Sequence, residues 1–190
     1  MQKIIKTIVL CAMTLAVTHS FAQDKMFTKT GSVSFDAEGA MKDVEEIKAA
    51  SKTATCVVVK STGAMEWAVL QKSFKFKNAL MEEHFNENYV ESTKFPKATF
   101  KGKLDDAAAV KWDKDGSYPV TATGKMTCHG VEKEMKTKGS VVIKKGVPTL
   151  NCTFDLAIAD YKITVPSVVG SKIAKDVKIT VSAALAPLKK

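Results

Sequence analysis

The first candidate for chemistry in this sequence is a histidine surrounded by acids. His84 stands in the run Glu82-Glu83-His84-Phe85-Asn86-Glu87. Imidazole and carboxylate groups at this spacing could bind a metal ion or exchange protons as an acid–base pair. An acid-rich helical segment is more often a solvated surface, so we expect no catalytic and no metal-binding residue here.

The second histidine, His129, precedes Gly130 at the end of an alternating segment, which is typical of a turn residue. The sequence contains no Gly-x-Ser-x-Gly nucleophile motif and no glycine-rich phosphate loop. These observations predict that the protein is not an enzyme and needs no cofactor.

Three cysteines, Cys56, Cys128 and Cys152, follow the leader segment described below. All three fall on the apolar side of their alternating segments, which predicts buried thiols. Their long spacing and the absence of Cys-x-x-Cys argue against a zinc cluster or a thioredoxin-like site. A bridge between Cys128 and Cys152 stays open, because connectivity does not follow from spacing.

The N-terminus has the features of an export signal. Lys3 and Lys6 precede an apolar run from Ile8 to Val17, which is too short to cross a bilayer as a mature helix. Small residues around Ala22 predict cleavage after that residue. We therefore expect a signal peptide over 1–22, a single domain over 23–190 with no transmembrane segment, and a periplasmic or secreted location.

The charge of the chain excludes one class of partner. The formal charge of +9 falls to +7 without residues 1–22, which contain two lysines and no acid. All 29 basic residues are lysine, so the arginine fork that reads guanine and clamps phosphate is absent. We expect no nucleic-acid partner and lysines on solvated strand faces, with peripheral contact with an anionic membrane as the less favoured alternative.

Most of the sequence alternates between apolar and polar residues with a period of two. In Lys97–Leu104, every even position is apolar or glycine and every odd position is lysine or threonine. The same pattern predicts further strands at 32–35, 52–60, 65–69, 74–77, 120–128, 134–143, 150–156, 161–165 and 177–183. About eight to ten such strands, separated by Gly-containing turns, predict an all-β fold with meander connections.

Two segments and two glycines complete the expected architecture. Met41–Ala50 and Asn78–Val90 break the alternation and are predicted to contain short helical segments. Gly102 and Gly124 lie on an inward face and allow strong curvature. An antiparallel sheet that curls shut removes its edges, so we expect a closed antiparallel β-barrel.

Several segments resemble the YceI-like family. Met81–Phe100 resembles its central signature, in which a helical segment leads into a Lys-aromatic-Pro-x-x-x-Phe strand. Gly124–Lys133 is similar to the family's strand that ends in a His-Gly turn. Phe154–Ile163 and Val177–Ile179 are similar to its last two core strands. These segments lie between Phe74 and Leu185, about two thirds of the chain after the leader.

The resemblance implies an elongated, lipocalin-like barrel whose apolar tunnel holds a polyisoprenoid or another long-chain amphiphilic lipid, as a carrier or a sequestering protein. Methionine and aromatic side chains adapt well to a flexible lipid chain. The residues expected to line the tunnel are Phe35, Met65, Trp67, Phe74, Phe76, Phe85, Phe100, Met126, Phe154, Leu156 and Ile163.

Other interpretations stay open at this point. A period of two predicts which side chains point inward but does not distinguish a hollow barrel from a solid core. A solid barrel would suit an envelope interaction or stress protein, and a site at His84 would suit a metal-dependent or hydrolytic envelope enzyme. The sequence defines neither the lipid nor the oligomeric state.

Overall fold

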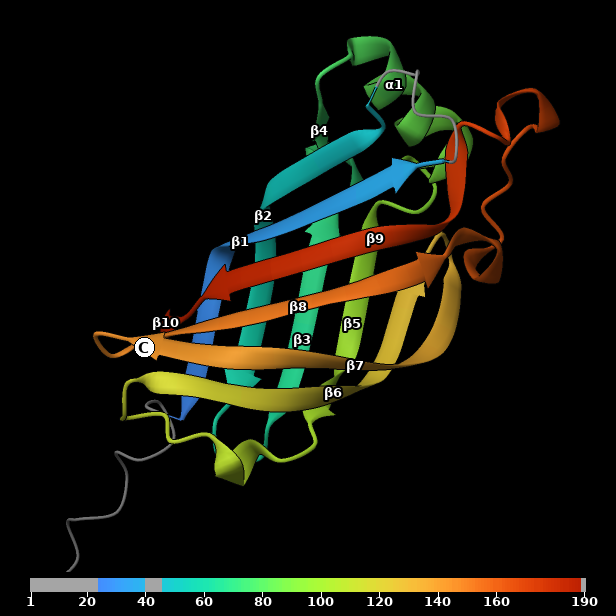
Figure 1. The fold of residues 1–190 in the computed structure, drawn as a ribbon. Coiled ribbons are helices and arrows are strands. Elements are labelled where there is room, and N and C mark those ends of the chain that lie inside the picture. Colours follow the sequence, from blue (N-terminus) through green and yellow to red (C-terminus); the bar gives the residue numbers. More distant parts are fainter. Residues whose placement is uncertain (1–23, 40–45, 189–190) are drawn as a thin grey trace, which may run out of the picture.

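The alternating segments form a closed antiparallel barrel in the computed structural model, which describes residues 24–39 and 46–188 (Figure 1). Ten strands occur in these residues: β1 Lys25–Glu38, β2 Lys48–Val59, β3 Ala64–Leu70, β4 Lys75–Phe76, β5 Lys97–Leu104, β6 Gly116–Cys128, β7 Val131–Lys144, β8 Val147–Ala157, β9 Ile173–Ala184 and β10 Ala186–Pro187. The predicted leader lies outside the described residues.

The eight long strands close on themselves in a meander. Their order is β1-β9-β8-β7-β6-β5-β3-β2, and pairing between β1 and β2 completes the barrel. The short strands β4 and β10 extend this sheet by pairing with β2 and β1. The all-β, closed and lipocalin-like architecture predicted from the sequence is therefore confirmed.

The helical elements are short and lie in the connections. Helix α1, Ala79–His84, begins where the Asn78 side chain accepts a hydrogen bond from the backbone N–H of Leu80 at 2.8 Å, and a π-helical turn, Phe85–Tyr89, continues it. This confirms the helical segment predicted over Asn78–Val90. Four 3₁₀ turns occur in the described connections: η1 Gln71–Ser73, η3 Ala107–Ala109, η4 Ile158–Tyr161 and η5 Ser167–Val169.

Two sequence predictions of local structure are wrong. The helical turn predicted over Met41–Ala50 fails at its end, because β2 begins at Lys48 and Ala49 pairs with Phe35 on one side and Phe76 on the other. Residues 40–45 lie outside the described residues. Sheet pairing on both sides of Ala49 overrides the local pattern.

The strand predicted over residues 161–165 is the second error. Tyr161 ends the turn η4, and Lys162 has a left-handed backbone conformation with φ of 56°. A residue in that conformation ends an extended run. Ile163 and Val165 therefore belong to an unpaired connection between β8 and β9, although their apolar side chains still turn inward.

Glycines allow a close approach of two strands and a tight turn at positions noted in the sequence. Gly102 and Gly124 stand directly opposite each other in β5 and β6, and a Cβ on Gly102 would lie 2.7 Å from the Cα of Gly124. Side chains there would force the two strands apart. In the β6–β7 hairpin, His129 and Gly130 both have positive φ, 49° and 73°, as a type I′ turn requires.

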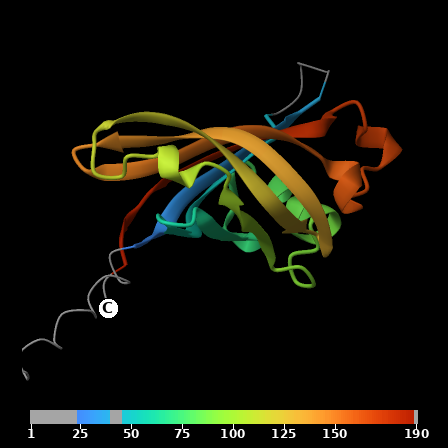
Figure 2. The same cartoon turned by 90° about the horizontal axis from the view of Figure 1, so that it is seen from below.

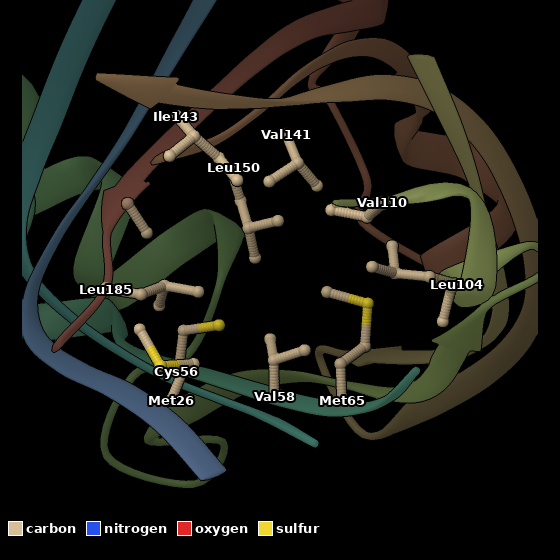
Figure 3. Close-up of a cluster of buried hydrophobic side chains, with 12 residues drawn as sticks. Met26, Cys56, Val58, Met65, Leu104, Val110, Val141, Ile143, Leu150 and Leu185 are labelled. Carbon is tan, nitrogen blue, oxygen red and sulfur yellow. The ribbon is translucent and has the colours of Figure 1, made fainter. Parts of the chain in front are cut away.

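The two ends of the barrel differ in what fills them. Figure 3 shows side chains from several strands, among them Val58, Val141 and Ile143, pointing toward one another at the end near β10. We call this region the packed end. At the opposite end lie α1 and the connection between β8 and β9 (Figure 2). No helix among the described residues is long and apolar enough to cross a bilayer.

Candidate ligand-binding tunnel

A cavity of about 410 Å³ lies inside the barrel at the α1 end. Its walls come from the last inward residues of β1, β3, β6 and β8 and from the first ones of β5 and β9. Met81 and Phe85 of the α1 region and Ile163 and Val165 of the β8–β9 connection complete the lining. A space of this size and apolar character is in the range of ligand-binding pockets.

A second cavity of about 130 Å³ lies deeper in the barrel, between the first cavity and the packed end. It includes Met65, Trp67 and Phe100 from neighbouring strands. Residues that line both cavities are Val33, Val69, Ala98, Met126 and Ile179. The shared walls make the two cavities adjoining parts of one elongated, largely apolar space, which we call the tunnel.

Four phenylalanines form one wall of the larger cavity. Phe35, Phe74, Phe76 and Phe85 come from β1, the η1–β4 segment and the helical turn after α1. The ring centroids of five of their six pairs lie 5.2 to 5.7 Å apart, and the rings of Phe35 and Phe85 are stacked. The aromatic contacts fix α1 against the end of the barrel.

The eleven residues predicted from the sequence to line a tunnel all border this space. Met65, Trp67, Phe100 and Phe154 line the smaller cavity, Met126 lines both, and Phe35, Phe74, Phe76, Phe85, Leu156 and Ile163 line the larger one. Their contact with a lipid stays a prediction.

Many lining residues are not among the predicted eleven, and two of them, Gln71 and Met135, could have been indicated by the strand pattern. Gln71 follows Trp67 and Val69 at two-residue intervals and continues their inward face into η1. Met135 pairs with Gly124 across β6 and β7 and lines the smaller cavity. A polar residue at the first position and weak alternation around the second hid both from the pattern.

Few polar groups face the larger cavity, and these groups differ in exposure. His84 and Lys172 line it but are exposed, whereas Gln71 and Cys128 are buried. Burial raises the pKa of the Cys128 thiol to about 11, so this group is neutral near pH 7. Burial also raises the pKa of the Tyr89 phenol.

His129 joins three connections at this end of the barrel. Its Nε2 lies 2.7 Å from Oε2 of Glu91, and its Nδ1 lies 2.9 Å from the backbone oxygen of Tyr161. The ring also packs edge-on against Phe95 at 4.8 Å. The turn role predicted for His129 is confirmed, and its side chain additionally ties the β8–β9 connection to the segment before β5.

Of the acids around His84, Glu82 is paired with a lysine, and Glu83 and Glu87 are exposed. Glu82 accepts a hydrogen bond from Lys75 at 2.6 Å, and this contact lowers the pKa of the Glu82 carboxyl. The Nδ1 of His84 lies 3.1 Å from Nδ2 of Asn88. No group of three or more potential metal ligands occurs in residues 24–39 and 46–188.

The three cysteines of the described chain are free thiols. Cys128 ends β6 beside the larger cavity, and Cys152 lies in β8 beside the smaller one. The bridge between them that the sequence left open is therefore not formed. Cys56 is fully buried in the packed end, as the alternation predicted.

The model of the YceI-like domain matches residues 12–185. The chain belongs to the YceI-like family. The resemblance noted in the sequence is thus confirmed over most of the chain. A search of the curated proteins finds no match.

Solved structures share this fold at low sequence identity. A polyisoprenoid binding domain from Saccharophagus degradans, implicated in plant cell wall breakdown, has a TM-score of 0.74 and 12% identity, covering 87% of this chain and 99% of its own. BcnA of Burkholderia cenocepacia has a TM-score of 0.66 and 16% identity over 82% and 96% of the two chains. A Campylobacter jejuni YceI protein has a TM-score of 0.54 and 15% identity over 76% and 88%.

Proposed function

We propose that this YceI-like protein is exported and holds one polyisoprenoid or other long-chain amphiphilic lipid in the tunnel, as a carrier or a sequestering protein. The observation that carries this proposal is the pair of adjoining apolar cavities, about 410 and 130 Å³ in volume. The leader predicted over 1–22 supports export, and the polyisoprenoid binding domain with the same fold supports the class of ligand.

The energetics favour retention of a flexible apolar chain. Each methylene removed from water contributes about 0.8 kcal/mol before the costs of association. Lining atoms that border an empty space lack partners for dispersion contacts, and a lipid tail would supply them. We propose binding without catalysis, since the acids near His84 are paired with lysine or exposed.

The direct test is to extract the protein, purified from its native host, with organic solvent and to identify the lipid by mass spectrometry. We expect one long-chain lipid per protein molecule. A protein that is isolated lipid-free and takes up no added polyisoprenoid would contradict the proposal.

A tunnel-filling variant sharpens this test. Ala98 lines both cavities, so Ala98→Phe should obstruct the passage between them and reduce the bound lipid. Val147→Phe is the control, because Val147 is 47% exposed at the packed end and lines neither cavity. Circular dichroism would establish that both variants keep the barrel.

A further inference from the structure

The connection between β8 and β9 and the start of β9 contain lysines but no acid. Between Asp160 and Asp176 the chain has three lysines, Lys162, Lys172 and Lys175, and no Asp or Glu. All three lysines are exposed, and none of them forms an ion pair within the part of the chain that the structure describes. Their ammonium groups are therefore available to an anionic partner.

An apolar side chain is exposed in the same connection. Val168 is 84% exposed, more than any other large hydrophobic residue in the described part of the chain. It lies in the turn η5, where the backbone N–H of Val169 donates to the Pro166 oxygen at 3.0 Å. Figures 1 and 2 both show this connection projecting from the barrel at the α1 end. One exposed valine is ordinary, but an exposed apolar residue among unpaired lysines is typical of a segment that contacts a membrane surface.

Other residues of this connection face the tunnel. Ile163, Val165 and Val169 line the larger cavity, whereas Val168 lines neither cavity. Lys172 lines the larger cavity and is exposed as well. A surface that contacts the connection would therefore lie next to the hollow end of the barrel.

Helix α1, at the same end, is less suited to an anionic surface. Leu80 is 56% exposed, but Glu83 and Glu87 are exposed in the same helical segment. Their carboxylates would be repelled by anionic lipids. The charges therefore favour contact through the β8–β9 connection.

The hairpin between β7 and β8, at the packed end, offers a comparison. Lys144, Lys145 and Val147 are exposed there, and Val147 is 47% exposed. The carboxylate of Asp115 accepts a hydrogen bond from the backbone N–H of Lys145 at 2.8 Å, so this hairpin also carries a negative charge. It combines fewer free lysines with a less exposed apolar residue.

We propose that the β8–β9 connection docks the protein on a lipid bilayer that contains anionic lipids. Val168 enters the head-group layer, and Lys162, Lys172 and Lys175 face the anionic head groups. Each lysine near such a surface strengthens binding about fivefold, and an apolar side chain that leaves water adds to this. The inference goes beyond the proposed function, because it concerns the surface that the protein contacts and not the lipid in its tunnel.

The test is flotation of the protein, purified from its native host, with two kinds of vesicle. One kind is phosphatidylcholine alone, and the other is an equal mixture of phosphatidylcholine and phosphatidylglycerol. We expect binding to the mixed vesicles to be at least about 20-fold tighter and to weaken as salt is added, because salt screens the lysines.

The same substitution at the two ends assigns the contact. Val168→Asp should weaken binding to the mixed vesicles at least about tenfold, because it removes an apolar contact and adds a repelled charge. Val147→Asp is the matched control at the packed end and should bind as the unmodified protein does.

Paired lysine variants test the charges in the same way. Lys162→Asn with Lys175→Gln should weaken binding to the mixed vesicles about 20-fold. Lys145→Asn with Lys144→Gln removes the same charge at the packed end and should have little effect. Lys162 and Lys145 both have positive φ, 56° and 51°, which asparagine tolerates.

The outcomes separate docking from the cargo. Equal binding to both kinds of vesicle, or binding to neither, would overturn docking on anionic membranes, and this result needs no variant to fold. Equal losses from Val168→Asp and Val147→Asp would overturn docking by this connection. Val168→Asp should keep any lipid that solvent extracts from the unmodified protein, since Val168 lines neither cavity. A lipid-free protein that still binds the mixed vesicles would support docking and contradict the proposed function alone.

Discussion

The packed end and the α1 end of this barrel are made from the same alternating strands, yet one is filled and the other is hollow. At the packed end, Val58, Val141 and Ile143 are at most 1% exposed. At the α1 end, larger side chains such as Phe35 and Phe76 are only half-buried and border a cavity of about 410 Å³. Side-chain size therefore does not decide which end is solid.

The difference lies in the connections between strands. Val110 of the β5–β6 connection and Leu185, just after β9, point into the packed end (Figure 3). Ala107 of the β5–β6 connection belongs to the same buried cluster, and these residues seal that end. At the other end, α1 and the β8–β9 connection line the space instead of filling it. Strand alternation sets the direction of the side chains, and the connections determine the volume that remains.

Two isoleucines give the largest expected contrast between the ends. Ile143→Ala, in the packed end, should lower the free energy of unfolding by about 3 kcal/mol, because it leaves a void in a closed core. Ile179→Ala should cost only about 1 kcal/mol, since Ile179 already borders both cavities. Denaturant unfolding of lipid-free protein measures both.

Lipid binding should reverse this order. Ile179→Ala is expected to weaken the affinity for a long-chain alcohol, and Ile143→Ala should leave it unchanged, because Ile143 lines neither cavity. Equal destabilisation by the two substitutions would mean that the ends do not differ in packing.

At the α1 end, His129 contacts both Glu91 and the β8–β9 connection. Replacing His129 should destabilise the protein less than Ile143→Ala does. His129→Asn keeps a residue that suits the Asn-Gly type I′ turn but removes the contacts to Glu91 and to the Tyr161 oxygen. We expect a loss of about 1 kcal/mol in the stability of the β8–β9 connection, or roughly fivefold faster tryptic cleavage after Lys162.

The second histidine provides the control for that experiment. His84→Asn changes an exposed residue whose one side-chain hydrogen bond within the described residues, to Asn88, lies in the same helical segment. Its cleavage rate should match that of the unmodified protein. Equal rates for both variants would show that the His129 contacts do not hold the connection.

The sequence predicted the barrel because its signals are local. Alternation in Lys97–Leu104 gave the bounds of β5, and the His129-Gly130 pair marked a hairpin. Burial follows from parity along each strand, so the inward direction of the tunnel residues that lie in strands could be read in advance, whereas Phe85 lies in a helical turn and Ile163 in an unpaired connection. These features need no knowledge of distant contacts.

The features that the sequence did not reveal depend on distant contacts. Ala49 is in a strand because Phe35 and Phe76 pair with it, and Lys162 is left-handed in a segment whose alternation predicted a strand. The hollow interior depends on how far α1 and the β8–β9 connection enter the barrel. The volume of the interior cannot be predicted from the periodicity of a single segment.

The cysteines give the finest probe of the difference between the ends. Burial raises the pKa of both Cys56, in the packed end, and Cys128, beside the larger cavity, where it reaches about 11. Only the thiolate reacts with iodoacetamide, so labelling of Cys128 should rise about tenfold per pH unit between pH 8 and 10. A lipid in the tunnel should slow that labelling, because Cys128 lines its wall. Cys56 should react only through unfolding and show no response to lipid, and equal protection of both thiols would indicate that lipid acts on the whole barrel and not on its hollow end.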